Sequence, residues 1–158
     1  MSTAESLTGS CTCGDIKYKV NASPLFVHCC HCTWCQRESG AAFAVNALVE
    51  TSNVEFLLGQ PQRIEVATTS GKGQSILRCQ KCQIAVSGHY GGLGDKVSFI
   101  RVGSLDQPNQ VQPDIHIYTN AKQSWVTLPE NVPATAGFYK FADIWPEDKL
   151  ARLGNVLK

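Results

Sequence analysis

Residues 30–35 read Cys30-His31-Cys32-Thr33-Trp34-Cys35 and place three cysteines within six positions. Two further sets flank this stretch, Cys11-Thr12-Cys13 before it and Cys79-Gln80-Lys81-Cys82 after it. Seven of the eight cysteines fall into these three sets, and Cys29 is the exception. Cysteines that serve only as small buried hydrophobic residues would not cluster in this way. We therefore interpret the three sets as metal ligands.

The cellular compartment expected for the protein affects the choice between metal ligands and disulfides. Residues 1–10 are polar, without a basic segment or an apolar segment, so no secretory signal is expected there. No stretch approaches the roughly 18 uninterrupted apolar residues of a membrane span. We expect a cytoplasmic protein with no membrane partner, whose thiols stay reduced. Clustered cysteines in such a protein favour metal sites over disulfides.

Length and composition bound the remaining possibilities. The chain has 158 residues, of which 43% are hydrophobic, so we expect a single folded domain over residues 1–158. Fourteen Lys and Arg face thirteen Asp and Glu, which leaves a formal charge of +1. A protein that neutralises phosphates needs a basic face, so no nucleic-acid partner is expected. The oligomeric state is not predicted.

Short segments of alternating apolar and polar residues recur along the chain. One example is Ile16, Tyr18 and Val20, which share a face with lysines between them. The segments interpreted as strands are 15–20, 25–28, 42–49, 54–58, 63–68, 75–78, 96–102 and 115–118. Glycine and proline turns separate them, which is typical of a mainly β domain.

One helix is predicted, at the C-terminus. Pro146 suits the first helical position, and acidic residues follow it in the first turn. Leu150, Leu153 and Leu157 then recur at helical spacing. The fold class expected is a mainly β, zinc-stabilised domain of short strands with a short C-terminal helix.

The number of ligands allows two partitions. The first and third sets together supply four thiolates for a closed site, which leaves three cysteines at residues 30–35 and an open fourth position on a second metal. A zinc-ribbon arrangement is the alternative. It would use Cys32 and Cys35 with Cys79 and Cys82, and would leave over Cys11, Cys13 and Cys30. Spacing does not separate these choices.

The motifs resemble a known family. The stretches that carry the resemblance are residues 9–14 (Gly-Ser-Cys-Thr-Cys-Gly), 30–40 (Cys-His-Cys-Thr-Trp-Cys-Gln-Arg-Glu-Ser-Gly), 78–82 (Arg-Cys-Gln-Lys-Cys) and the pattern within 116–129. Together they are similar to the glutathione-dependent formaldehyde-activating (GFA) family, whose domain is shared with centromere protein V. The resemblance covers about residues 7–133, and residues 134–158 form a C-terminal extension.

This resemblance implies a β-rich fold built around two zinc ions and selects the first partition. It implies a structural zinc site of Cys11, Cys13, Cys79 and Cys82. It also implies an active-site zinc held by Cys30, Cys32 and Cys35, for which Ser39 and Gly40 are expected to end a ligand loop. One position departs from the family pattern, because Gln83 stands where a glycine usually follows the last cysteine.

The activity implied is the addition of glutathione to formaldehyde, which gives S-(hydroxymethyl)glutathione; the reverse reaction makes the class carbon–sulfur lyase. The expected partners are a small-molecule thiol and an aldehyde. Zinc with three thiolates has a net charge of −1, so it should acidify water poorly yet still hold a fourth thiolate. Glutathione is an anion at neutral pH, and Arg37 and Lys72 are the cations predicted to bind it.

Other residues leave alternatives open. His28 shares the face of Cys30 and Cys32 in an extended segment, so it could close the three-cysteine site. Cys29 is expected to be a buried thiol, or else a spare ligand or redox partner, and His31 to point away from the ligands. His116 is interpreted as a strand histidine that faces a polar partner.

Two other functions compete with catalysis. The first is a non-catalytic module, either a glutathione carrier or a zinc-stabilised interaction domain. The second is a purely structural zinc protein with closed sites. Ligand access to the second metal, followed by turnover, separates these hypotheses.

Overall fold

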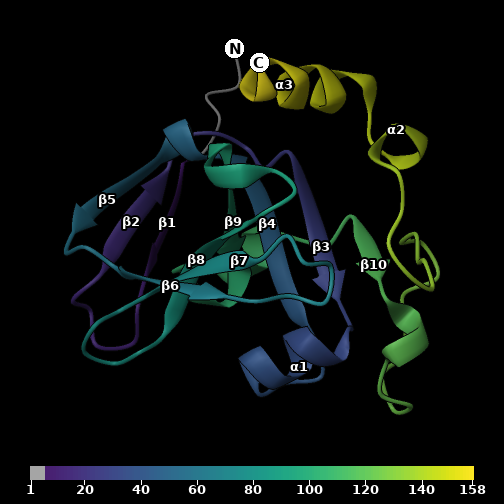
Figure 1. Ribbon diagram of the computed structural model, residues 1–158, viewed down its shortest axis with the longest axis horizontal. Coiled ribbons are helices and arrows are strands. Elements are labelled where there is room, and N and C mark those ends of the chain that lie inside the picture. The colour runs from purple at the N-terminus through teal and green to yellow at the C-terminus, as the bar shows by residue number, and fades with distance from the viewer. Residues whose placement is uncertain (1–5) are drawn as a thin grey trace.

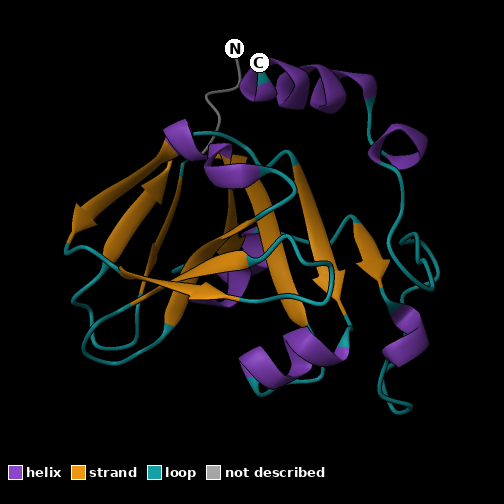
Figure 2. Ribbon diagram, in the orientation of Figure 1, coloured by secondary structure: helices purple, strands orange, loops and turns teal. Residues whose placement is uncertain are grey.

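The computed structural model describes residues 6–158, so part of the segment examined for a signal, residues 1–5, lies outside it. Its strands are β1 (Leu7–Ser10), β2 (Lys17–Val20), β3 (Phe26–Cys30), β4 (Ala44–Glu50), β5 (Val54–Leu58), β6 (Gln62–Val66), β7 (Gln74–Arg78), β8 (Ala85–Tyr90), β9 (Val97–Arg101) and β10 (Ile115–Ile117). Its α-helices are α1 (Thr33–Ser39), α2 (Phe141–Ile144) and α3 (Glu147–Leu157). Short 3-10 helices are η1 (Thr51–Asn53), η2 (Gly94–Lys96), η3 (Val102–Ser104), η4 (Pro108–Gln110) and η5 (Thr119–Ala121). The protein is mainly β with a short C-terminal helix (Figure 2), as the sequence predicts.

Within the described residues the strands form three small sheets. Their orders are β1-β2-β5, β10-β3-β4-β9 and β6-β7-β8. The four-stranded sheet is central, and β10 pairs with β3 in parallel while the other neighbours are antiparallel. Figure 1 shows α1 at one end of β3 and β4 and α3 at the opposite end. No helix among residues 6–158 is long and apolar enough to cross a membrane.

Both faces of the central sheet are buried. Val27 and Ala47 face one hydrophobic cluster, which also includes Tyr18 of the β1-β2-β5 sheet. Phe26 and Leu48, their immediate neighbours in the chain, belong to a second cluster on the other face. Successive side chains of a strand point to opposite faces, so β3 and β4 each serve two cores.

The C-terminal segment covers the second face. Trp145 stacks on Phe26 with ring centroids 5.0 Å apart and on Phe141 at 4.5 Å. The Arg152 guanidinium of α3 donates hydrogen bonds to both carboxylate oxygens of Glu50, at 2.9 and 2.8 Å. These contacts hold α3 against the end of β4.

Two strands, β1 and β8, and two α-helices, α1 and α2, were not predicted. Residues 7–10 and 85–90 contain glycine and serine, which weaken the alternating pattern. In β1, Gly9 is required by packing, because a Cβ there would overlap the Tyr18 ring. The helix α1 falls within residues 30–40, where a ligand loop was expected.

Candidate metal centres and the adjoining cavity

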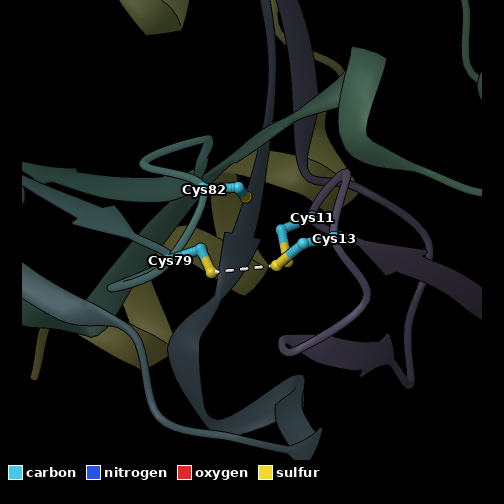
Figure 3. A group of neighbouring side chains, drawn as sticks. All are labelled: Cys11, Cys13, Cys79 and Cys82. Carbon is cyan, nitrogen blue, oxygen red and sulfur yellow. Dashed lines mark hydrogen bonds between the residues drawn. The ribbon is translucent and has the colours of Figure 1, made fainter.

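Four cysteines from two distant parts of the chain converge in Figure 3. Cys11 and Cys13 follow β1, and Cys79 and Cys82 follow β7. The Sγ atom of Cys13 lies 3.6 Å from that of Cys11 and 3.6 Å from that of Cys79, and all four sulfurs are within 4.8 Å of one another. Thiolates bound to tetrahedral zinc at about 2.3 Å are about 3.8 Å apart. The four-cysteine cluster therefore fits a closed zinc site.

The two halves of this cluster are similar tight turns. The Cys11 amide donates to the carbonyl of Ile16 at 3.1 Å, and the Cys79 amide donates to that of Ile84 at 3.0 Å. Gly14, after the second cysteine of the first turn, has φ +80°. Gln83 occupies the corresponding position in the second turn with φ +63°. Gln83 therefore adopts the left-handed conformation that glycine adopts in the first turn. This conformation is strained for a residue that has a side chain.

The second cluster gathers Cys30, Cys32 and Cys35 without Cys79 or Cys82, so the zinc-ribbon partition does not form. Cys30 ends β3, and Cys32 caps α1 by accepting a hydrogen bond on Sγ from the Cys35 amide at 3.3 Å. The expected loop is thus wrong for residues 33–39, because one turn of helix brings residues 32 and 35 to the same side. Gly40 ends the helix with φ +67°.

The three thiols interact strongly. Hydrogen bonds from the Cys30 and Cys35 thiols lower the pKa of Cys32. Hydrogen bonds with Cys30, the largest contributor, and with Cys32 raise the pKa of Cys35. In the other cluster, a backbone hydrogen bond from Ile84 lowers the pKa of Cys82 to about 6. Cys32 and Cys82 are thus prepared to be thiolates, the form that binds metal.

A cavity of about 530 Å³ adjoins the three-cysteine cluster, and all three cysteines line it. This volume falls within the range of small-molecule sites. Its walls come from the central sheet, the β6-β7-β8 sheet, the Gly71–Gly73 turn and the C-terminal extension. Further lining residues include Trp34, Asn46, Tyr90, Phe99, Tyr118, Phe138 and Phe141. Polar side chains also line it, among them Thr68, Thr69, Ser70, Gln74, Ser75 and His89. The cavity therefore combines aromatic side chains with many polar ones.

The two predicted cations lie in different surroundings. Lys72 lines the cavity, and among residues 6–158 its ammonium group has no ion-pair or hydrogen-bond partner. Arg37 is exposed on α1 and does not line the cavity. Arg101, which sequence analysis missed, also lines it and donates to Oδ1 of Asn46 and Oε2 of Glu38, each at 2.9 Å.

His28 lines the same cavity but lies outside the three-cysteine cluster. Its Nε2 atom contacts the Tyr139 hydroxyl at 2.7 Å, and the indole N–H of Trp145 donates to the same hydroxyl at 2.7 Å. Burial lowers the pKa of His28 to about 4. His28 is therefore engaged by the C-terminal extension rather than grouped with the thiols.

Glu38 connects the two cysteine clusters. It lies in α1, three residues after Cys35, and its carboxylate pairs with both Arg101 and Arg78, the residue before Cys79. Its side chain is only 8% exposed. A second cavity, of about 710 Å³, borders this ion pair and Cys11 but no cysteine of the second cluster.

A third cluster was not predicted as a unit. Cys29, His31 and His116 lie together, buried on the face of β3 and β10 opposite Cys30. His31 points away from the three thiols, as alternation predicts, and the polar partner expected for His116 is His31. The missing information was the pairing of β3 with β10, which the sequence does not specify.

Residues 6–121 match the sequence profile of the family described as glutathione-dependent formaldehyde-activating enzyme. A Rhodobacter sphaeroides protein of known crystal structure is similar in fold, with a TM-score of 0.51 and 18% sequence identity; the likeness covers 81% of this chain and 99% of that one. Among curated protein sequences, none matches this chain significantly.

Proposed function

The chain belongs to the glutathione-dependent formaldehyde-activating family, and on that premise we propose that it adds the thiol of glutathione to formaldehyde at the cavity beside Cys30, Cys32 and Cys35. The observation that supports this most is the position of the three-cysteine cluster on the wall of a cavity. A closed structural site would need no such access.

The residues fit two zinc ions of different kinds. Cys11, Cys13, Cys79 and Cys82 would hold a structural ion, since four thiolates complete its coordination. Cys30, Cys32 and Cys35 would hold the second ion, with one position left for substrate. When bound, this zinc supplies a Lewis acid that keeps the incoming thiol in its thiolate form near neutral pH.

The reaction proposed is an addition without a change of oxidation state. The thiol sulfur forms a bond to the carbonyl carbon, the carbonyl π bond opens, and the oxygen takes the proton that the thiol releases. The Tyr118 hydroxyl lines the cavity, and burial together with neighbouring cysteines and Tyr90 raises its pKa. Tyr118 thus keeps its proton and can donate a hydrogen bond to the carbonyl oxygen.

Substrate binding is assigned to Lys72, which lines the same cavity. The ammonium group of Lys72, which has no partner among the described residues, would bind a glutathione carboxylate, because glutathione carries net negative charge at neutral pH. Arg101 is already paired with Glu38, so it adds less to this interaction. Phe138 and Phe141 supply apolar surface to the same cavity.

The experiment measures exchange between ¹³C-formaldehyde and its glutathione adduct by NMR, since this equilibrium is reached without a catalyst. We expect the zinc-loaded protein to raise the exchange rate in proportion to its concentration. Cys32→Ser should return the rate to the background, Tyr118→Phe should lower it without weakening glutathione binding, and Arg37→Ala should have no effect. Stoichiometric glutathione binding with an unchanged exchange rate would identify a carrier and overturn the proposal.

A further inference from the structure

Cys29, His31 and His116 form a compact and fully enclosed group. Their exposed fractions are 1%, 0% and 7%. The Sγ atom of Cys29 lies 3.6 Å from Nε2 of His31, which lies 2.9 Å from Nδ1 of His116. We propose that these three residues bind a soft metal ion at a third site, separate from the two cysteine clusters.

The strands hold these side chains in place without the metal. In the parallel pairing of β3 and β10, His116 is directly opposite Cys29, so both project from the same face. Hydrogen bonds fix the flanking backbone. The His31 amide donates to the Ile117 carbonyl at 3.0 Å, and the His116 amide donates to the Pro133 carbonyl at 2.9 Å. A site on paired strands requires little reorganisation when an ion binds.

Hydrogen bonding alone accounts poorly for this group. His31 Nε2 has either one proton or one lone pair, yet it faces both Cys29 and His116. The other ring nitrogen, Nδ1, is buried and has no hydrogen-bond partner among the described residues. The polar contacts of the His31 ring therefore all converge on one point, where an ion would engage three lone pairs at once.

The distances suit metal coordination after a small adjustment. Around an ion with bonds of about 2.05 Å to nitrogen and 2.3 Å to sulfur, two imidazole nitrogens are about 3.3–3.6 Å apart. Nitrogen and sulfur are then about 3.6–3.8 Å apart. The contact between Cys29 and His31 already has this length, and the 2.9 Å contact between the two histidines must open by about 0.4–0.7 Å.

The donor set and burial indicate which ion. A thiolate and two imidazoles favour copper(I) or zinc over magnesium or calcium. Among residues 6–158 no fourth cysteine, histidine or carboxylate joins the cluster. Copper(I) with one thiolate and two neutral imidazoles has no net charge, whereas zinc would leave +1 in a buried site, which is costly. Copper(I) is therefore the ion proposed.

Histidine provides a specific readout, because neither cysteine cluster contains one. Full-length protein with zinc in those clusters is titrated with copper(I), buffered in acetonitrile, and the four imidazoles are followed by long-range ¹H–¹⁵N NMR. We expect Nε2 of His31 and Nδ1 of His116 to shift with one equivalent. His28 and His89 serve as internal controls and should not shift. Unchanged resonances of His31 and His116 would overturn the proposal, and a response to zinc alone would overturn the choice of ion.

Metal counting tests the same site independently. Cys29→Ala should lose one bound copper per chain, while Val27→Ala, a truncation on the same face of the same strand, should retain it. Equal copper content in the two variants would contradict the site. His116→Asn provides a second variant with a polar group in place of Nδ1, should Cys29→Ala fail to fold. Wild-type protein that binds this copper but does not raise the rate of formaldehyde exchange would count against the proposed function alone.

Discussion

Cys29 and Cys30 are adjacent in β3, yet their thiols lie on opposite faces of the central sheet and belong to different clusters. Cys29 lies with His31 and His116, and Cys30 lies with Cys32 and Cys35. Alternation along the strand separates them, and both residues are buried, with exposed fractions of 1% and 6%. One short strand therefore supplies ligand candidates to two separate groups.

The two cysteine clusters should respond differently to mutation. Cys79→Ser should prevent stable folding, because structural zinc contributes on the order of 10 kcal/mol to the folding of small zinc domains. Cys32→Ser should fold nearly normally and retain one zinc per chain instead of two. Thermal unfolding together with zinc content measures both effects. A cooperative melt of Cys79→Ser close to that of the wild type would remove the structural role.

Gly14 and Gln83 offer a matched test of backbone strain. Gln83→Gly should raise the free energy of unfolding by up to about 1 kcal/mol, because relief of the left-handed strain exceeds the entropy lost by glycine. Gly14→Ala should lower it by about 1–2 kcal/mol, since its φ is equally positive. Urea unfolding of zinc-loaded variants gives both values. Destabilisation by Gln83→Gly would show that the side chain, whose Nε2 donates to Gln80 at 2.9 Å, outweighs the strain.

The Glu38 carboxylate should contribute to stability far more than an exposed carboxylate does. Glu38→Gln should lower the free energy of unfolding by about 3 kcal/mol, because Arg78 and Arg101 would lose their shared buried partner. Glu65→Gln removes the partner of Arg63 at the surface, where the Glu65 side chain is 68% exposed, and should cost well under 1 kcal/mol. Equal losses in urea unfolding would disprove the distinction.

The pairing of Glu50 with Arg152 predicts a pH dependence. Burial acts to raise the pKa of Glu50, but hydrogen bonds from Arg152 outweigh it and lower the pKa. The folded protein therefore holds the charged form more strongly, so this stabilisation is present above the unfolded pKa of about 4.3 and is lost as pH falls. Arg152→Gln should be less stable than the wild type at pH 7, and the difference should shrink below about pH 4. A difference that stays constant with pH would rule out the linkage.

Lys72 is expected to affect the binding of charged thiols only. Lys72→Ala should raise the KM for glutathione about tenfold, consistent with a charge-assisted hydrogen bond worth about 1.5 kcal/mol, with little change in kcat. With 2-mercaptoethanol, which has no carboxylate, wild type and variant should have the same KM. Arg37→Ala is the control cation, and an equal effect at both positions would indicate general electrostatics instead of a specific contact.

Much of the fold was predictable because its signals are local. Alternation in residues 54–58 and 63–68 coincides with β5 and largely with β6. The predicted C-terminal helix forms as α3, although Pro146 is its N-cap and not its first helical residue. The helix α1 was missed because its few residues follow a cysteine cap instead of one of the residues that usually cap helices. The strand β8 was missed because Ser87 and Gly88 break its apolar pattern, although both are buried by neighbouring strands.

The sequence by itself determined that the cysteines form sets with metal-binding spacing, since Cys11 and Cys13, or Cys79 and Cys82, meet within one turn of chain. Only the tertiary structure decided which sets join, because the approach of β1 to β7 depends on how the sheets pack. It also decided that Lys72 reaches the cavity and Arg37 does not. The grouping of Cys29 with His116 arises in the same way. Spacing along the chain determines which residues within one turn can meet. Which distant strands pair depends instead on how the chain buries both faces of the sheet.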